Sequence, residues 1–255
     1  MQRSVEKRRK LLIIGICGCL MYVIGDFLYA ATGKGQSTEA IGLFTKVAYL
    51  EMATWRMWAS IICGFVGTLL YYMGFTQMYD LLKIHITDNK NQIWVKLFRI
   101  SYIIGTVAWA WVHAMFMTNA LIFKYVYEAY GDVQTAADIA NRVLYANAPG
   151  MVISYIICDV GLAIIMITLV WKGIIPLKKT GSRILATFCN PIVFPGFIGN
   201  VAAVFPWPVN QLDHGTESFG HALVLVLGLI LLNEMTKSGE IGKKAPDAKK
   251  PLGRG

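Results

Sequence analysis

The sequence predicts an all-α fold, a polytopic integral membrane bundle of six transmembrane helices with both termini in the cytoplasm. The first observation is composition: the 255 residues are 56% hydrophobic and 15% charged, with a mean hydropathy of +0.52. Soluble domains carry about 25% charged residues. The other two observations are the length of the apolar runs and the uneven distribution of Lys and Arg.

Six apolar runs approach the length of about 20 residues that a helix needs to cross the hydrocarbon core. In chain order they span residues 11–31, 58–79, 97–123, 151–171, 184–205 and 219–232. The last run is short, unless residues 214–218 are helical as well. The fifth run contains Pro191 and Pro195, which predict a kink in that helix.

The positive charges give the predicted orientation, because cytoplasmic loops of membrane proteins collect Lys and Arg. With the N-terminus inside, only five of the 24 Lys and Arg residues fall in outer segments: Lys34, Lys46, Arg56, Lys124 and Arg142. The net charge of +9 therefore reflects sorting across a bilayer and requires no nucleic acid partner. A basic cytoplasmic end also attracts anionic membrane lipid.

Two domains follow from this map. Residues 1–235 form the six-span transmembrane domain, and residues 236–255 form a basic, disordered cytoplasmic tail. Within the third outer segment, residues 136–144 have apolar side chains at helical spacing and predict a short amphipathic helix on the outer surface. Pro149 and Gly150 then predict the turn into the fourth span.

Polar and ionisable side chains inside the runs predict a pocket, because such groups are costly in lipid and usually face protein or water. From the helix rise of about 1.5 Å per residue, these groups lie between the outer surface and the middle of the membrane. A pocket open to the outside fits this asymmetry better than a channel, which needs polar groups throughout. The candidate pocket residues are Asp26, Arg56, His113, Asp159, Asn200, Glu217 and His221.

Glu217 and His221 are one helical turn apart and share one face of a helix, if that segment is helical. With His113 they form a candidate metal site of nitrogen and oxygen ligands, which zinc accepts, with Asp26 or Asp159 as a further ligand or general base. Each of these groups also has an ordinary structural explanation, such as a hydrogen bond that joins two helices.

The segment GDFLYA at the end of the first span and EMATWRMWASIICGFVGTLLYYMGFTQMYDLL in the second resemble a bacterial family of six-helix membrane proteins, a domain of unknown function. The pair Gly25-Asp26 and Arg56 carry the likeness. The resemblance implies six spans and a bacterial inner membrane, and it implies no activity. A looser, chemical likeness links the Asp and His residues to intramembrane metal hydrolases of the ceramidase type.

Three functions follow as hypotheses. The first is a protein that binds or transports a small molecule or lipid headgroup in the outward-facing pocket. The second is a metal-dependent intramembrane hydrolase, with zinc as the candidate metal, acting on a lipid or amphipathic substrate. The third is a structural membrane subunit whose buried polar groups only join helices. The sequence predicts no particular oligomeric state.

Overall fold

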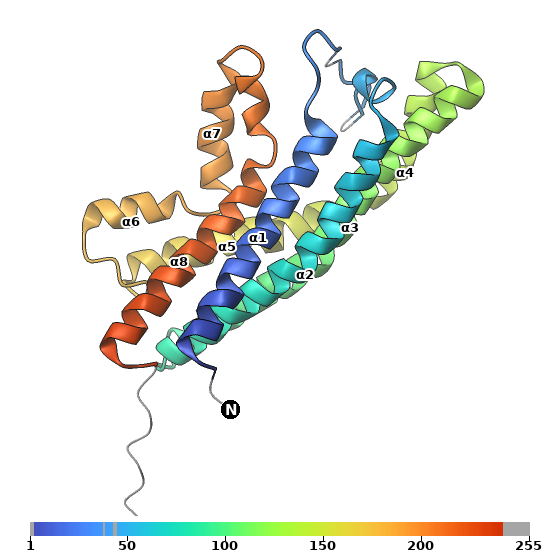
Figure 1. Cartoon of the computed structure of the whole chain (residues 1–255). Coiled ribbons are helices and arrows are strands. Elements are labelled where there is room, and N and C mark those ends of the chain that lie inside the picture. The colour runs from blue at the N-terminus through green and yellow to red at the C-terminus, as the bar shows by residue number, and fades with distance from the viewer. Residues whose placement is uncertain (1–2, 38, 43–44, 242–255) are drawn as a thin grey trace, which may run out of the picture.

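The computed structural model describes residues 3–37, 39–42 and 45–241 (Figure 1). Regular structure in this part of the chain is helical, apart from an isolated bridge between Ala40 and Lys46, so the predicted all-α class is confirmed. Five helical segments are long and apolar enough to cross a membrane. They are α1 (Val5–Ala30), α2 (Thr54–His85), α3 (Gln92–Tyr130), the continuous segment Val133–Trp171 and α8 (Thr216–Ser238).

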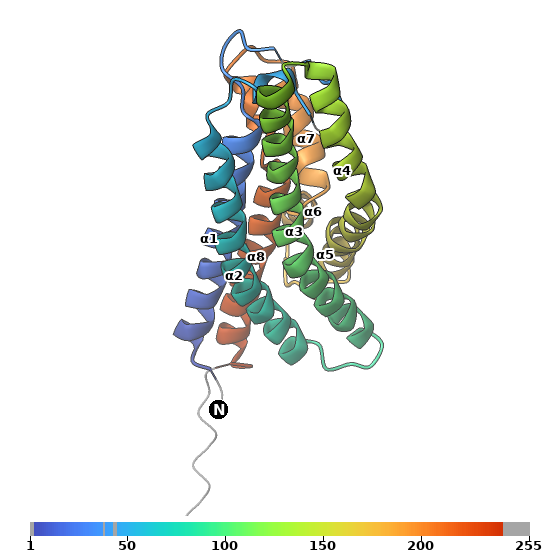
Figure 2. The same ribbon diagram turned by 90° about the vertical axis from the view of Figure 1, so that its right-hand side faces the viewer.

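The helices form an elongated bundle in which α1 packs against α2 and α8, and α2 packs against α3. Figures 1 and 2 show that the start of α1, the α2–α3 connection and the end of α8 lie at one end of the bundle. Glycines bring the backbones of α1 and α2 together: a Cβ atom added to Gly15 would lie 2.5 Å from the Cα atom of Gly74. Small residues permit this kind of close approach in membrane helix pairs.

Large apolar side chains cover the outside of the bundle. Leu69 in α2 is 68% exposed and Val107 in α3 is 71% exposed, while Tyr71 and Phe75 are buried inside. A soluble protein rarely exposes a large contiguous apolar surface, and lipid is the medium in which such a surface is stable. The helices are therefore apolar on the outside as well as in the core.

The third outer segment departs from its prediction. Residues 136–144 belong to α4 (Val133–Tyr155), which continues through Pro149 without a turn. Residues 136–144 are helical as predicted, but they are part of a longer helix and not a separate surface helix, and the predicted turn at Pro149-Gly150 is wrong. Gly131, with a φ of 71°, ends α3 in the left-handed conformation, and the Asp132 carboxylate caps α4 by accepting a hydrogen bond from the backbone N–H of Thr135. A tight α3–α4 turn results, and neighbouring helices allow the proline to lie within α4.

The fifth apolar run is not one helix, which corrects the predicted kinked span. It forms α6 (Thr180–Thr187) and α7 (Val193–Ala203), and Figure 1 shows α6 lying crosswise to α7. The break is held by Asn190, which is fully buried. Its amide Nδ2 donates to the carbonyl of Thr187, while its Oδ1 accepts from the backbone N–H groups of Ile192 and Val193. One side chain thus satisfies backbone groups at both helix ends.

We expect Asn190→Ala to lower the free energy of unfolding by about 1.5 kcal/mol, since it leaves buried backbone groups at two helix ends without partners. Reversible unfolding in mixed micelles with increasing dodecyl sulfate measures this change. Asn200→Ala is the matched control, because Asn200 is exposed on α7 and its side chain bonds a carbonyl of its own helix, that of Gly196. An equal loss in both variants would contradict a specific role for Asn190.

The C-terminal end of the described chain contacts the end of α2. His85 Nδ1 lies 2.8 Å from a carboxylate oxygen of Glu240, just after α8. This hydrogen bond holds the pKa of Glu240 below its usual range. Of the predicted disordered tail, residues 242–255 lie outside the described residues.

Candidate functional site

The centre of the candidate site is a buried pair between Asp159 and His221. Asp159 Oδ1 and His221 Nε2 lie 2.6 Å apart, and the two side chains are 0% and 3% exposed. The rings of Tyr71, Phe75 and Trp109 surround the imidazole edge-on, with centroids within 6 Å of its own. The pair therefore joins the fourth span to α8 inside an aromatic shell.

Asp159 is carried by an irregular turn. Residues Ile156–Val160 form a π turn between α4 and α5 (Gly161–Trp171), all within one continuous helical segment. π turns insert one extra residue into a helix and are frequent at functional sites. The irregularity changes the direction in which Asp159 leaves the helix relative to the α-helical residues before it.

Glu217 lies one helical turn before His221, in the first turn of α8. The helix begins at Thr216, so Glu217, Ser218 and His221 are helical and Glu217 and His221 share a face, as predicted. Glu217 and Asp159 are near enough for their carboxyl groups to interact. Because an ionised carboxylate only accepts, a hydrogen bond between them requires one of the two to carry a proton.

A second pair contacts α8 at Ser218, three residues before His221. Asp26 Oδ2 accepts a hydrogen bond of 2.9 Å from Ser218, and its Oδ1 lies 3.7 Å from His113 Nε2. The His113 ring stacks on Tyr22, with centroids 4.9 Å apart. Gly64 makes room for it, since a Cβ atom there would lie 2.7 Å from the His113 Cβ atom. Polar groups from α1, α3, α8 and the π turn thus meet in one region.

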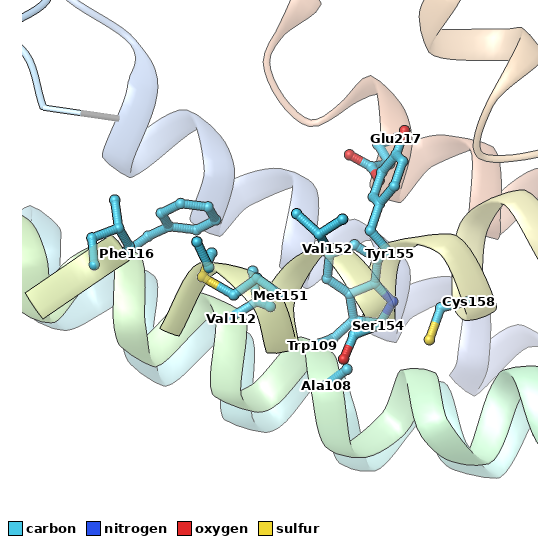
Figure 3. Close-up of a pocket in the computed structure, with 12 residues that line it drawn as sticks. Ala108, Trp109, Val112, Phe116, Met151, Val152, Ser154, Tyr155, Cys158 and Glu217 are labelled. Atoms are coloured by element: carbon cyan, nitrogen blue, oxygen red, sulfur yellow. The ribbon is translucent and has the colours of Figure 1, made fainter. Parts of the chain in front are cut away.

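An apolar cavity of about 350 Å³ lies beside the Asp159–His221 pair (Figure 3). In Figure 3, Phe116 lies at one end, whereas Glu217, Tyr155 and Trp109 gather toward the other. The cavity reaches the surface of the bundle, because the lining residues Val152 and Tyr155 are 56% and 41% exposed. Its lining is mostly apolar, with Ser154 as a further polar residue, and the one carboxylate in the lining, Glu217, lies at one end.

Four buried polar atoms in this region have no hydrogen-bond partner among the described residues: Trp109 Nε1, Asp159 Oδ2, Glu217 Oε1 and His221 Nδ1. An unsatisfied buried group costs about 1–3 kcal/mol. Two of these atoms belong to residues that line the cavity, Trp109 and Glu217. Their concentration at one place is the strongest sign of a binding site in the described chain.

The comparison with protein families decides the relationship of this chain. Residues 1–235 match the family of unknown function DUF6796. The chain belongs to DUF6796. This confirms the resemblance to a domain-of-unknown-function family. No curated protein and no solved structure matches the sequence.

Two of the predicted pocket residues of this DUF6796 member lie apart from the pairs described above. Arg56 donates to the carbonyls of Phe27 and Ala31, at 3.3 and 2.7 Å, and so binds the C-terminal end of α1. Cations favour this position because of the helix dipole. Asn200 is exposed on α7 and donates to the carbonyl of Gly196 in its own helix.

The predicted metal ligands fall into two pairs: His113 lies with Asp26, and His221 lies with Asp159 beside Glu217. Among residues 3–37, 39–42 and 45–241, no three His, Cys, Asp or Glu side chains are grouped as a metal site would require. The zinc hypothesis therefore has no assembled ligand set to support it, and it stays a prediction.

A polar cluster that sequence reasoning missed also lies in this DUF6796 domain. Asn119 Nδ2 donates to Thr45 Oγ1 at 3.0 Å, and the Thr45 hydroxyl donates to Asn141 Oδ1 at 2.9 Å. Asn141 in turn donates to the carbonyl of Ile41. The cluster fastens the loop after α1 to α3 and α4. An amide inside the apolar run 97–123 was the available signal for Asn119.

Proposed function

We propose that this protein is a six-crossing membrane protein that binds or transports a small amphipathic molecule or lipid in the cavity beside Glu217. In this proposal α6 and α7 together make the sixth crossing, and both termini are cytoplasmic. The distribution of Lys and Arg supports that orientation. The π turn and the start of α8 then lie in the outer half of the membrane, and the cavity opens toward lipid.

The observation that carries the proposal is the combination of an apolar cavity with unpartnered acceptors at one end. When the two carboxyl groups share one proton, one carboxylate stays ionised, so Glu217 Oε1 and Asp159 Oδ2 still offer a negatively charged hydrogen-bond acceptor. A ligand that completes the site therefore brings a hydrogen-bond donor, and an amine does so with a complementary charge. The aromatic rings of Trp109 and Tyr155 in the lining also favour a cation. The cavity volume is within the range of small-molecule sites.

The test uses the full chain in phosphatidylcholine nanodiscs with radiolabelled decylamine as the probe. We expect Glu217→Gln to weaken decylamine binding by tenfold or more, because a charge-assisted hydrogen bond contributes about 1.5–3 kcal/mol. Decanol has the same chain length and no charge, so it measures partition into lipid. Decanoate has the same chain length and a negative charge, so it measures the preference for charge. Glu128→Gln is the control, because Glu128 is an exposed carboxylate on α3.

Two results would contradict this proposal. One is decylamine binding that is equal in wild type and Glu217→Gln, or no stronger than decanoate binding. The other is near-stoichiometric zinc in protein purified without chelators and its loss in His221→Ala, which would favour the metal hydrolase. If every pocket variant only lost stability and no probe bound, the structural-subunit hypothesis would replace both.

A further inference from the structure

A second concave surface lies at the opposite end of the bundle from the α3–α4 turn. It is a groove of about 710 Å³ between the last turns of α2 and the first turns of α3. It shares its end of the bundle with the start of α1 and the end of α8 (Figure 2). The residues that line it are Tyr79, Lys83, Gln92, Val95, Lys96, Arg99, Ile100, Ile103 and Ile104. We refer to it below as the basic groove.

The groove is cationic. Lys83, Lys96 and Arg99 are all exposed, and none of the nine lining residues is acidic. No carboxylate in the described part of the chain forms an ion pair with any of these three side chains, whereas nearby Arg3 pairs with Asp80. The Arg99 guanidinium lies 5.6 Å from the centre of the Tyr79 ring, which helps to position it. The groove therefore has three positive charges without an internal partner.

The groove is also apolar along its length. Ile100, Ile103 and Ile104 follow Arg99 on α3, so they lie up to about 7.5 Å farther from the end of the bundle by helix rise. Ile100 is 50% exposed and Ile103 is 39% exposed. The cationic groups lie near the helix ends, and the exposed isoleucines lie beyond them. This order matches a phospholipid, in which the charged headgroup is followed by acyl chains.

From this arrangement we propose that the basic groove is a specific site for an anionic phospholipid. Lys83, Lys96 and Arg99 bind the phosphate, and one acyl chain packs along Ile100, Ile103 and Ile104. Basic pockets between transmembrane helices are suited to anionic lipid headgroups. A free phosphate would leave the isoleucines uncovered, and a nucleic acid has no acyl chain for them. The site is independent of the cavity beside Glu217.

The test is native mass spectrometry of detergent-purified full-length protein given equal amounts of phosphatidylglycerol and phosphatidylcholine of the same acyl chains. We expect wild type to retain phosphatidylglycerol in preference, and the triple variant K83Q/K96Q/R99Q to lose that preference by roughly a hundredfold, at about tenfold or less for each charge. The control K7Q/R9Q/K10Q removes three exposed charges from the start of α1 at the same end of the bundle. It should keep the preference.

The source of the phosphate is distinguished in a second arm. Glycerol phosphate, which has the charge and no acyl chain, should fail to displace the bound lipid. The variant I103N, in which Lys83, Lys96 and Arg99 are intact, should retain the lipid less well. Equal loss in the control triple variant would overturn the proposal in favour of general surface charge. Full displacement by glycerol phosphate would overturn it in favour of a soluble anion.

Discussion

Replacement of Asp159 by Ala is expected to lower the free energy of unfolding by about 3 kcal/mol, because it leaves a buried partner unsatisfied in a low-dielectric environment. Asp159 Oδ1 lies 2.6 Å from His221 Nε2, and both side chains are almost fully buried. Dodecyl sulfate unfolding in mixed micelles, followed by circular dichroism, measures the change. Asp138→Ala is the control, because Asp138 is an exposed carboxylate on the same continuous helical segment.

A double-mutant cycle attributes the loss to the pair. His221→Leu should destabilise the wild type strongly and the Asp159→Ala variant much less, since the stability effects of substitutions at residues in direct contact are not additive. Additive losses would show that each residue acts alone, and would contradict the pairing. Glu217→Gln is expected to change stability little, because it keeps the shape of the side chain. That contrast separates binding from folding in the same region.

A second large effect is expected at the closest helix contact. Gly15→Ala should destabilise the protein by about 2 kcal/mol, because the new Cβ atom would lie 2.5 Å from Gly74 Cα and 2.7 Å from a methyl group of Leu225. Backbone cannot yield as a flexible side chain can, so α1 must move away from α2. The same unfolding assay measures the loss.

Gly196→Ala provides the matched control for this contact. Gly196 lies within α7, and a Cβ atom there meets no atom within 4 Å. Ala has the higher helix propensity by up to about 1 kcal/mol, so the control should be neutral or slightly more stable. Comparable destabilisation of both variants would mean that the α1–α2 contact is not the cause.

Helix positions were the most predictable part of this fold. The apolar run 11–31 covers all but the first turns of α1, and the run 58–79 lies within α2, because a bilayer selects for long apolar stretches whatever their partners. The fifth run failed as a single helix for a local reason. Hydropathy averages over a short break, and the capping of two helix ends by the buried side chain of Asn190 leaves no trace in that average.

The residues of the candidate site were easier to predict than the pairs that they form. Asp26, His113, Asp159, Glu217 and His221 were recognisable because ionisable groups are expensive inside apolar runs. Which of them meet depends on how each helix is rotated about its axis. The helical period of 3.6 residues does not predict the direction of the Asp159 side chain, because the π turn interrupts that period there. The amide of Asn119 gave a weaker signal, because a neutral amide costs less than a charge inside an apolar run. Asn141 lies outside the six apolar runs.

The π turn has a consequence for any relative of this chain. Each residue turns an α-helix by about 100°. A family member with one residue fewer between positions 156 and 160 would form a regular α-helix there, because the π turn takes up its extra residue locally and leaves α4 and α5 in nearly the same relative rotation. Without the extra residue, the carboxylate at position 159 would leave the helix in a different direction from the one that meets His221 of α8. Length in this short segment is therefore as strong a requirement on the site as the identity of its residues.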